Sequence, residues 1–297
     1  MRFIPGGSMS LSIRSFFSLS AVLVFCVLPI ASSVRAAGSA ELTLFYTGET
    51  HAMLYPCSCP IETDGGVARR AALLKTLRKN LPNSLLLDSG GFFAGGLMDE
   101  YTQSADLDLE RTKLNLKAMA VMKYDAVAVG DEEFDFGRAF LENAAKQSPA
   151  AFLSANVACP NTVPFVIKRL PVATVGIIGI TPPSAGPKAG GLTVEDNIKS
   201  LAYAIKEVRA KGADIVILLS HLGESEDLAL LKAVEGIDVV VSGNGRSSSP
   251  EPSVKVGTVL LLRPSWQGRR MCKAVLTLEN RRLVDSQVEE IRLSDKV

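Results

Sequence analysis

Short apolar segments alternate with amphipathic segments along most of the chain after residue 40. The apolar runs are flanked by glycine, proline or polar residues, which is typical of buried strands, and the amphipathic segments have the apolar spacing of helices. Strands that alternate with helices predict an α/β fold. No internal repeat or linker interrupts the pattern, so a single domain is expected. The predicted strands span 42–46, 84–88, 126–129, 152–155, 166–180 (a hairpin), 214–219, 239–241, 259–263, 271–278 and 283–291, and the predicted helices span 66–80, 106–122 and 193–211.

The first 36 residues have the pattern of a secretory signal peptide. Residues 1–14 contain Arg2 and Arg14 but no acidic residue, residues 16–30 are apolar, and Val34 and Ala36 are small residues of the kind a signal peptidase reads. An uncleaved membrane anchor is the alternative, but the apolar segment is shorter than the roughly 20 residues that a span needs. We therefore expect a cleaved signal over 1–36, a domain over 37–297, and a periplasmic or secreted protein without stable membrane insertion.

Composition narrows the class of protein. The chain has 297 residues, of which 47% are hydrophobic and 21% are charged, and its formal net charge is +1. These values are typical of a soluble globular protein of enzyme size. No basic patch interleaved with aromatic residues is present, so nucleic acid is excluded as a predicted partner.

The cysteines allow two interpretations. Export would leave four of them in an oxidising compartment, namely Cys57, Cys59, Cys159 and Cys272, and four cysteines can pair in three ways. Structural disulfides are therefore one interpretation. Cys57 and Cys59 are separated by one residue, which is too close for a comfortable mutual disulfide. The other interpretation is a redox-active or metal-binding thiol pair in a loop near His51.

Polar side chains follow the predicted strands at the point where each strand ends. Both histidines of the chain are among them. Because the carboxyl ends of parallel strands meet at one edge of a sheet, we expect these side chains to gather on one rim and to form a metal or acid–base site. The set consists of Glu49, His51, Asp88, Asp131, Asp135, Asn156, His221, Asn244 and Arg246.

The residues lie in a series of short motifs. The motifs are, in order, Glu49-x-His51, Gly65-Gly66-x-x-Arg69, Asp88-Ser-Gly90, Gly130 followed by Glu133-Phe134-Asp135, Ser154-Ala-Asn156, Ser220-His221 and Ser242-Gly243. This order resembles the calcineurin-like metallophosphoesterases, and within them the bacterial periplasmic 5′-nucleotidase branch. The resemblance covers about residues 41–263, and it implies a four-layer αββα sandwich with a pair of divalent metals that activate water. The segment Tyr55-Pro-Cys57-Ser-Cys59-Pro60 is similar to a divergent exported branch with a cysteine or selenocysteine loop.

Three functional groups of the family pattern are missing from this chain. The family has an aspartate that bridges two metals where this chain has Gly91, and it has a general-acid histidine where this chain has Glu132. The last family motif contains histidines where this chain has Asn244 and Arg246. Two divalent ions a few ångströms apart need a shared anionic ligand to offset their repulsion, so the sequence predicts at most one ion per chain.

The resemblance and the residue chemistry together give each candidate a role. Glu132 is expected to donate a proton, and Asp135 is expected to orient a neighbour. Cys57 and Cys59 are candidate redox groups that could also favour a softer metal. Arg69 is a candidate for anion binding, although Arg69 and Arg70 could instead solvate a helix face. The predicted ligands for a single Zn, Mn or Fe ion are Glu49, His51, Asp131 and His221, with Asp88 as a further candidate, and the predicted anion-binding residues are Arg69, Asn156, Asn244 and Arg246.

Three functions follow from these assignments. The first is an exported protein with a remodelled metal site and a Cys-x-Cys loop, which performs thiol-redox or single-metal chemistry on a small anionic substrate, with a periplasmic redox partner as the alternative partner. The second is a metal-dependent phosphoester hydrolase similar to 5′-nucleotidases, and the third is a non-enzymatic binding module. A separate C-terminal nucleotide-binding domain is not expected, so nucleoside specificity does not follow from the resemblance.

Overall fold

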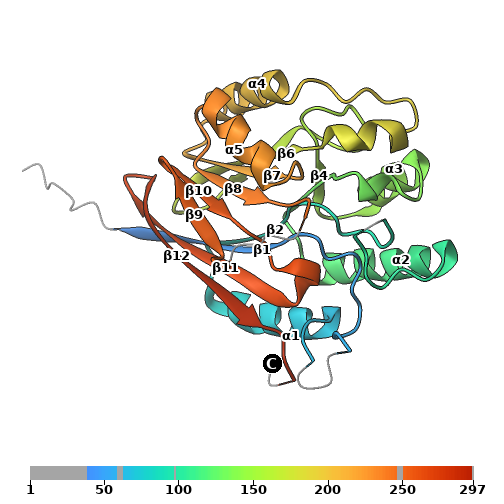
Figure 1. Cartoon of the computed structure of the whole chain (residues 1–297). Coiled ribbons are helices and arrows are strands. Elements are labelled where there is room, and N and C mark those ends of the chain that lie inside the picture. The colour runs from blue at the N-terminus through green and yellow to red at the C-terminus, as the bar shows by residue number, and fades with distance from the viewer. Residues whose placement is uncertain (1–38, 59–62, 97, 246–249, 296–297) are drawn as a thin grey trace, which may run out of the picture. The chain divides into compact units, whose positions relative to one another are not determined.

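Two six-stranded sheets form the centre of the structure, a computed structural model that describes residues 39–295 except 59–62, 97 and 246–249 (Figure 1). The first sheet has the strand order β12-β11-β1-β2-β3-β4, and the second has the order β5-β6-β7-β8-β10-β9. The strands are β1 (Ala40–Thr47), β2 (Ser84–Asp88), β3 (Ala126–Ala128), β4 (Ala151–Leu153), β5 (Phe165–Arg169), β6 (Thr174–Ile180), β7 (Ile215–Ser220), β8 (Val239–Ser242), β9 (Ser253–Val256), β10 (Val259–Leu262), β11 (Arg270–Glu279) and β12 (Arg282–Arg292).

Parallel pairing places the ends of the central strands on one rim. In the first sheet β1, β2, β3 and β4 pair in parallel, and in the second β6, β7, β8 and β10 do so. The outer strands β11, β12, β5 and β9 pair antiparallel. The loops that follow β1, β2, β3, β7 and β8 therefore leave the sheets at carboxyl ends, where open α/β sheets place their sites.

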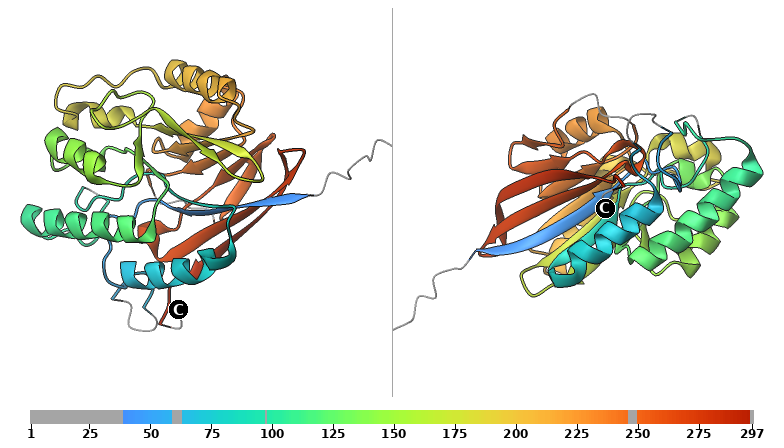
Figure 2. Two further views of the ribbon diagram at one scale, coloured as in Figure 1. Left: turned by 180° about the vertical axis from the view of Figure 1, so that it is seen from behind. Right: turned by 90° about the horizontal axis from the view of Figure 1, so that it is seen from below.

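Helices cover the outer face of each sheet. Leu74 of α1, Met119 of α2 and Leu141 of α3 pack in one apolar cluster with Phe45 and Leu86 of the first sheet. Figure 2 shows α1 and α2 side by side on this face. The helices are α1 (Val67–Leu77), α2 (Ala105–Met122), α3 (Arg138–Gln147), α4 (Asn197–Ala210) and α5 (Glu224–Ala233), with short 3₁₀ helices at η1 (Arg78–Asn80), η2 (Glu132–Phe134), η3 (Pro183–Lys188) and η4 (Trp266–Gly268).

The second sheet has its own helices, and a third core lies between the sheets. Leu201 of α4 and Leu230 of α5 pack on Ile178 of β6 in one cluster. Between the sheets, Leu44 of β1 shares a core with Ile217 of β7. Strands covered on both faces read as continuous apolar runs, which is why every residue of β2 and β7 is buried. The layer order α/β/β/α confirms the predicted four-layer sandwich.

Most predicted elements agree with the structure to within a few residues, and the hairpin of β5 and β6 is confirmed. The helix predicted from 193 begins at Asn197, where the Asp196 side chain accepts a hydrogen bond from the Lys199 N–H. The helices α3 and α5, the strand β9 and the short 3₁₀ helices η2, η3 and η4 were not predicted.

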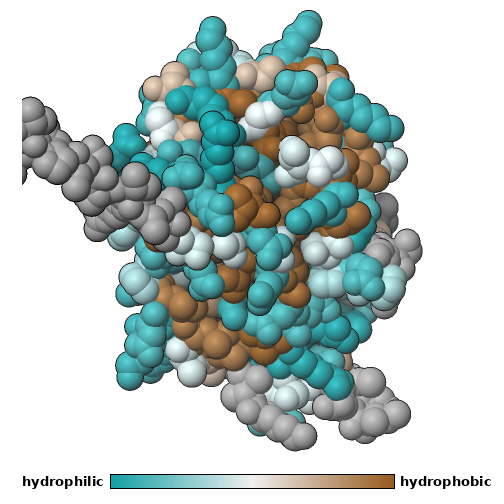
Figure 3. Space-filling model, turned by 90° about the vertical axis from the view of Figure 1, so that its left-hand side faces the viewer, coloured by the Kyte–Doolittle hydropathy of each residue, from teal (hydrophilic) through white to brown (hydrophobic). Residues whose placement is uncertain are grey.

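The described residues fall in one compact unit, Ala37–Val297, and the predicted signal peptide over 1–36 lies outside them. Within the described part of the chain, no helix is long and apolar enough to cross a membrane. Seen from the end at which β1 begins, the surface mixes hydrophilic and hydrophobic side chains (Figure 3).

Candidate metal centre

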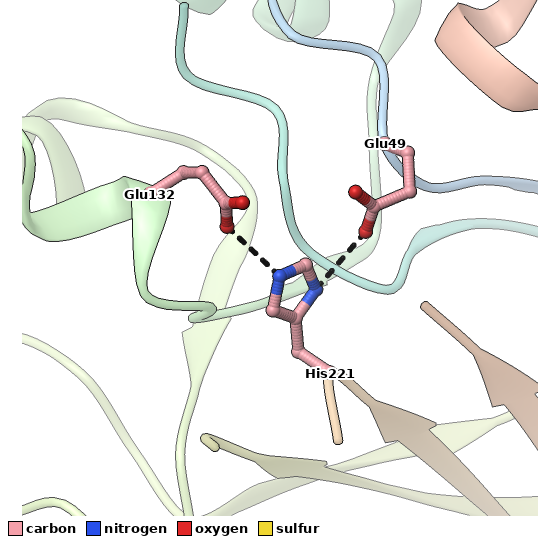
Figure 4. A group of neighbouring side chains, drawn as sticks. All are labelled: Glu49, Glu132 and His221. Atoms are coloured by element: carbon pink, nitrogen blue, oxygen red, sulfur yellow. Dashed lines mark hydrogen bonds and ion pairs between the residues drawn. The ribbon is translucent and has the colours of Figure 1, made fainter. Parts of the chain in front are cut away.

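Glu49, Glu132 and His221 bring their side chains together from three different loops. Glu49 follows β1, Glu132 begins η2 after β3, and His221 follows β7. One ligand atom of each lies within 4.8 Å of the others, and within the described residues these three form the group that could hold a metal ion. The two carboxylates point toward opposite sides of the imidazole ring (Figure 4). All three side chains are buried.

The imidazole of His221 is held on both ring nitrogens. Nδ1 lies 2.9 Å from the Ser89 carbonyl oxygen and 3.4 Å from Oε1 of Glu49. Nε2 lies 2.9 Å from Oε2 of Glu132 and 3.8 Å from Oδ1 of Asp131. Burial by itself lowers the pKa of His221, but the charges of Glu49 and Glu132 outweigh it and raise the pKa well above its usual value. Without a metal, the ring is therefore a cation between carboxylates.

The surroundings of Glu132 favour its ionised form, and its role as a proton donor stays a prediction. Burial raises the pKa of Glu132, but its hydrogen bond to His221 and the charge of that ring are stronger and lower the pKa below its ordinary value. A carboxylate held in its ionised form is a poor proton donor. The predicted donor is thus placed as a potential metal ligand.

His51 lies beside Glu49, and its ring has no hydrogen-bond partner among the described residues. The backbone is left-handed at Glu49 (φ 51°), His51 (φ 41°) and Ala52 (φ 47°), a conformation that L-residues rarely adopt and that is concentrated at functional sites. Nε2 of His51 lies 3.3 Å from Oε2 of Glu49, but neither ring nitrogen nor that oxygen makes a hydrogen bond. Trp266 stacks edge-on against the ring, with centroids 5.3 Å apart. Nε2 of His51 and Oε2 of Glu49 thus pair only with each other as an ion pair, and Nδ1 of His51 makes no hydrogen bond to any described residue.

Arg111 of α2 anchors the His51 loop from behind. Its guanidinium donates to the His51 carbonyl oxygen at 2.7 Å and to carboxylate oxygens of Asp99 and Asp108 at 2.9 and 2.8 Å. The planar fork of arginine makes several such bonds at once, which an ammonium group cannot do in the same geometry. This anchor had no signal in the sequence, because Arg111 lies in an ordinary amphipathic helix.

Glu133 organises the two loops that face His221. Its carboxylate accepts hydrogen bonds from the backbone N–H groups of Gly91, Phe92 and Phe93 after β2, and from Gly130 after β3, at 2.7 to 3.2 Å. Burial raises the pKa of Glu133 to about 8, although the His221 charge and the N–H donors act in the opposite direction. The side chain is therefore a structural clamp that lies outside the group of ligands.

Asp131 and Asp135 meet a lysine that the sequence analysis did not identify. Nζ of Lys188, at the end of η3, lies 3.3 Å from Oδ2 of Asp131 and 2.8 Å from Oδ1 of Asp135. The charged neighbour of Asp135 is Lys188, and an orienting role for Asp135 stays a prediction. Asp131 lies 3.8 Å from Nε2 of His221 and is outside the three-residue ligand group. No sequence signal connects Lys188 to this rim, because it comes from a loop that follows a strand of the other sheet.

Asp88 is engaged away from the three ligands. Its carboxylate accepts hydrogen bonds from the Thr47 hydroxyl at 2.5 Å and from the Gly90 N–H at 2.8 Å. Burial raises the pKa of Asp88 to about 6, against the effect of these bonds and of Arg70. These contacts place Asp88 in the turn that follows β2, so its prediction as a metal ligand is not supported.

The predicted anion-binding residues are used inside the protein. Arg69 donates to the carbonyl oxygens of Thr63 and Leu293. The amide of Asn156 donates to the Thr181 carbonyl and Asn197, and accepts from the Thr181 N–H. These bonds hold Arg69 and Asn156 within the protein, and their binding of an external anion stays a prediction.

Two further positions near the last parallel strands were predicted to bind an anion. The Asn244 N–H donates to Oε1 of Glu49 at 2.6 Å, so the anion that Asn244 binds in the structure is that carboxylate. Arg246 lies outside the described residues. Arg70, for which the sequence allowed a place on a solvated helix face, is only 1% exposed. Its charge acts to lower the pKa of Asp88 and of Tyr124, against the effect of their burial.

The described cysteines are free thiols. Cys57, Cys159 and Cys272 are buried and form no disulfide, and Cys59 lies outside the described residues. The Asp64 N–H donates to Sγ of Cys57 at 3.1 Å. Burial raises the pKa of Cys159 to about 11 and that of Cys272 to about 12. Cys57 is absent from the ligand group found within the described residues, so the prediction of a thiol at the metal site is not supported.

An apolar groove of about 1000 Å³ lies beside the Cys57 loop. Pro56 and Ser58 line it together with side chains of α2 and α3. None of the three ligands lines this groove.

The comparisons with known proteins agree with this architecture. No family model matches the sequence. The chain is 30% identical to a snake venom 5′-nucleotidase from Crotalus adamanteus over 274 residues, which cover 84% of this chain and 45% of that protein. A 5′-nucleotidase precursor from Thermus thermophilus matches the structure with a TM-score of 0.74 and 28% identity, over 86% of this chain and 55% of that chain. The calcineurin-like phosphoesterase YfkN from Bacillus subtilis matches with a TM-score of 0.69 and 26% identity, over 88% of this chain and 93% of that chain.

The chain has the calcineurin-like phosphoesterase fold. Its relatives in sequence are 5′-nucleotidases and nucleotide phosphoesterases, of which it spans about half the length or less. The phosphoesterase likeness implies divalent metal, and the residues present fit such an ion. They supply two carboxylates and an imidazole within 4.8 Å, and the His51 ring lies alongside. Carboxylate and imidazole ligands suit Zn, Mn and Fe.

Proposed function

We propose that the protein is a phosphoester hydrolase that uses a single divalent ion held by Glu49, Glu132 and His221. The observation that carries the proposal is the convergence of these three buried side chains at the carboxyl rim of a phosphoesterase sandwich. Relatives named for nucleotide and phosphoester hydrolysis support the same reaction class. Gly91 occupies the position of the family's metal-bridging aspartate, which supports one ion in place of two.

The residues around the three ligands have distinct tasks in this proposal. A bound divalent ion supplies a Lewis acid and lowers the pKa of water. His51, whose Nε2 lies 3.3 Å from Oε2 of Glu49, extends the ligand group, and the hydrogen bond of Arg111 to the His51 carbonyl oxygen keeps the loop in place. Asp131 lies at the edge of the site with its side chain 16% exposed, and Lys188 beside it offers a positive charge to an approaching phosphate.

Nucleotides are the first substrates to examine, and small phosphate monoesters and diesters are the second. The names of the relatives support nucleotides, but the matched region covers less than half the length of those proteins. We also propose that the protein works in the periplasm or is secreted. The signal-like first 36 residues support this location, as does the description of one structural relative as a precursor.

Thiol-redox chemistry has less support. Cys57 is buried, and its sulfur already accepts a backbone hydrogen bond. A reactive thiol is normally exposed enough to reach its partner.

Hydrolysis of generic phosphoesters by the metal-depleted and metal-reloaded protein tests the proposal. We expect turnover of p-nitrophenyl phosphate or bis(p-nitrophenyl) phosphate after reloading with Zn²⁺, Mn²⁺ or Fe²⁺, and little before. Glu49→Gln and His221→Ala should each reduce the rate by about 100-fold or more, because each removes a ligand. Glu289→Gln is the matched control, because it neutralises an exposed carboxylate on β12 that pairs with Lys273. No turnover with any ion, or full activity in His221→Ala, would contradict the proposal.

A further inference from the structure

Gly91 faces the carboxylate of Glu49 with no space for a side chain. A Cβ atom at position 91 would lie 2.9 Å from Oε1, 3.1 Å from Cδ and 3.1 Å from Oε2 of Glu49. Real Cβ atoms rarely come this close to another heavy atom. The Glu49 carboxylate therefore fills the volume that a side chain on the turn after β2 would enter.

The same carboxylate lies between two histidines that belong to different sheets. Oε2 is 3.3 Å from Nε2 of His51, which follows β1 of the first sheet. Oε1 is 3.4 Å from Nδ1 of His221, which follows β7 of the second sheet, and it also accepts the Asn244 N–H. One carboxylate thus connects both imidazoles of the chain.

The length of the Glu49 side chain makes this position possible. The residue lies at the end of β1 in a left-handed conformation, and its backbone N–H donates to the Gly90 carbonyl at 2.9 Å. The His51 N–H likewise donates to the Gly91 carbonyl at 2.8 Å. With the two loops tied in this way, an aspartate at position 49 would withdraw the carboxylate by about one C–C bond, roughly 1.5 Å.

We propose that Glu49 and Gly91 are a matched pair. The long side chain of Glu49 places the shared ligand carboxylate between His51 and His221, and glycine at 91 is required to admit it. The pair determines the position of the metal ion and hence the affinity of the site. The inference rests on the metal site of the proposed function and is independent of hydrolysis.

A double-mutant cycle that measures metal affinity tests the pair. Zn²⁺ or Mn²⁺ affinity is measured by calorimetry, and stability without metal is measured by urea unfolding, for the wild type, Gly91→Ala, Glu49→Asp and the double variant. Gly91→Ala should weaken metal binding by about 10-fold or more, since it displaces a ligand carboxylate. In the Glu49→Asp background, Gly91→Ala should reduce metal affinity much less, because the shorter side chain at position 49 leaves room for the methyl group.

Gly95→Ala is the matched control. Gly95 is in the same loop with the same left-handed backbone (φ 96°), but its Cβ would meet only Oδ2 of Asp135 among the described residues, at 3.9 Å. The substitution therefore carries the conformational strain without the clash, and metal affinity should change by less than about 3-fold.

The outcomes separate the pair from the proposed reaction. The inference would be overturned if Gly91→Ala reduced metal affinity equally in both backgrounds, or if alanine at 91 and at 95 reduced it equally. Absence of metal binding by the wild type would also overturn it. If Gly91→Ala does not fold, recovery of folding in the double variant shows the coupling, and no recovery contradicts it. Coupling in a protein without phosphoester turnover would refute hydrolysis and leave the pair standing.

Discussion

Gly130→Ala should disrupt the slot that holds the His221 ring. A Cβ atom at position 130 would lie 2.6 Å from Nε2 and 2.8 Å from Cγ of His221, and closer still to Cδ2. Ordinary contacts between carbon atoms are about 3.5–4.0 Å, so the ring or the loop must move by about 1 Å. The ring cannot move freely, because Nδ1 is held 2.9 Å from the Ser89 carbonyl oxygen and Nε2 is held 2.9 Å from Oε2 of Glu132.

The cost follows from overpacking and from lost hydrogen bonds. Overpacking a buried site costs about 1–3 kcal/mol, and the loss of one charge-assisted bond of the ring costs about 1.5–3 kcal/mol more. We therefore expect the free energy of unfolding to fall by about 3–5 kcal/mol, measured by urea denaturation at neutral pH without metal.

Gly186→Ala is the control for this experiment. Within the described residues its Cβ would meet only Cγ2 of Val194, at 3.8 Å, and its backbone is not in the left-handed region. Its free energy of unfolding should stay within about 1 kcal/mol of the wild type. A Gly130→Ala variant as stable as this control would refute the view that the His221 ring is rigidly enclosed.

Three further predictions concern the surroundings of the site. Burial raises the pKa of Asp227 from 3.8 to about 6 despite hydrogen bonds from Ser220 and Ser242, so its contribution to stability is complete below pH 3.8 and is lost as the pH rises through 6. The free energy of unfolding of Asp227→Asn relative to that of the wild type, measured by urea denaturation, should rise by about 3 kcal/mol between about pH 3.5 and 7.5. A difference that does not depend on pH would contradict this. Arg111→Lys should lower the free energy of unfolding by about 2 kcal/mol, because lysine cannot reproduce the fork of bonds, and an unchanged urea midpoint would contradict that. Native Cys159 and Cys272 should resist a thiol reagent at about pH 8 and react in urea, as followed by mass spectrometry; rapid native labelling of either would contradict their burial.

The strands and the location of the site follow from general rules that act on local sequence. Apolar runs such as 84–88 predict buried strands, and parallel strands bring their carboxyl ends to one rim, which is why Glu49 and His221 could be placed together. The helices that were missed are short. In α5 only Asp227 and Leu230 are buried, so its apolar face is too narrow to recognise. β9 is a four-residue edge strand with no buried side chain.

The roles of individual side chains depended on tertiary contacts that have no local signature. Asp131 and Glu132 are adjacent, and only the direction of the turn into η2 decides which of them meets His221. Lys188 arrives from a distant loop. Arg69 and Arg70 are also adjacent, yet Arg70 is buried while Arg69 donates to the Leu293 carbonyl near the end of the described chain. The spacing of residues in the sequence predicts which side chains lie on the rim of the sheets. Their contacts there depend on tertiary packing.

The number of metal ions bound per chain tests the central claim most directly. The metal-depleted protein is titrated with Zn²⁺ or Mn²⁺, and bound ions are counted by elemental analysis after dialysis, for the wild type and for His221→Ala. The account predicts about one ion per wild-type chain and at least about 10-fold weaker binding in the variant. Two ions per chain, no ion, or undiminished binding by His221→Ala would contradict it.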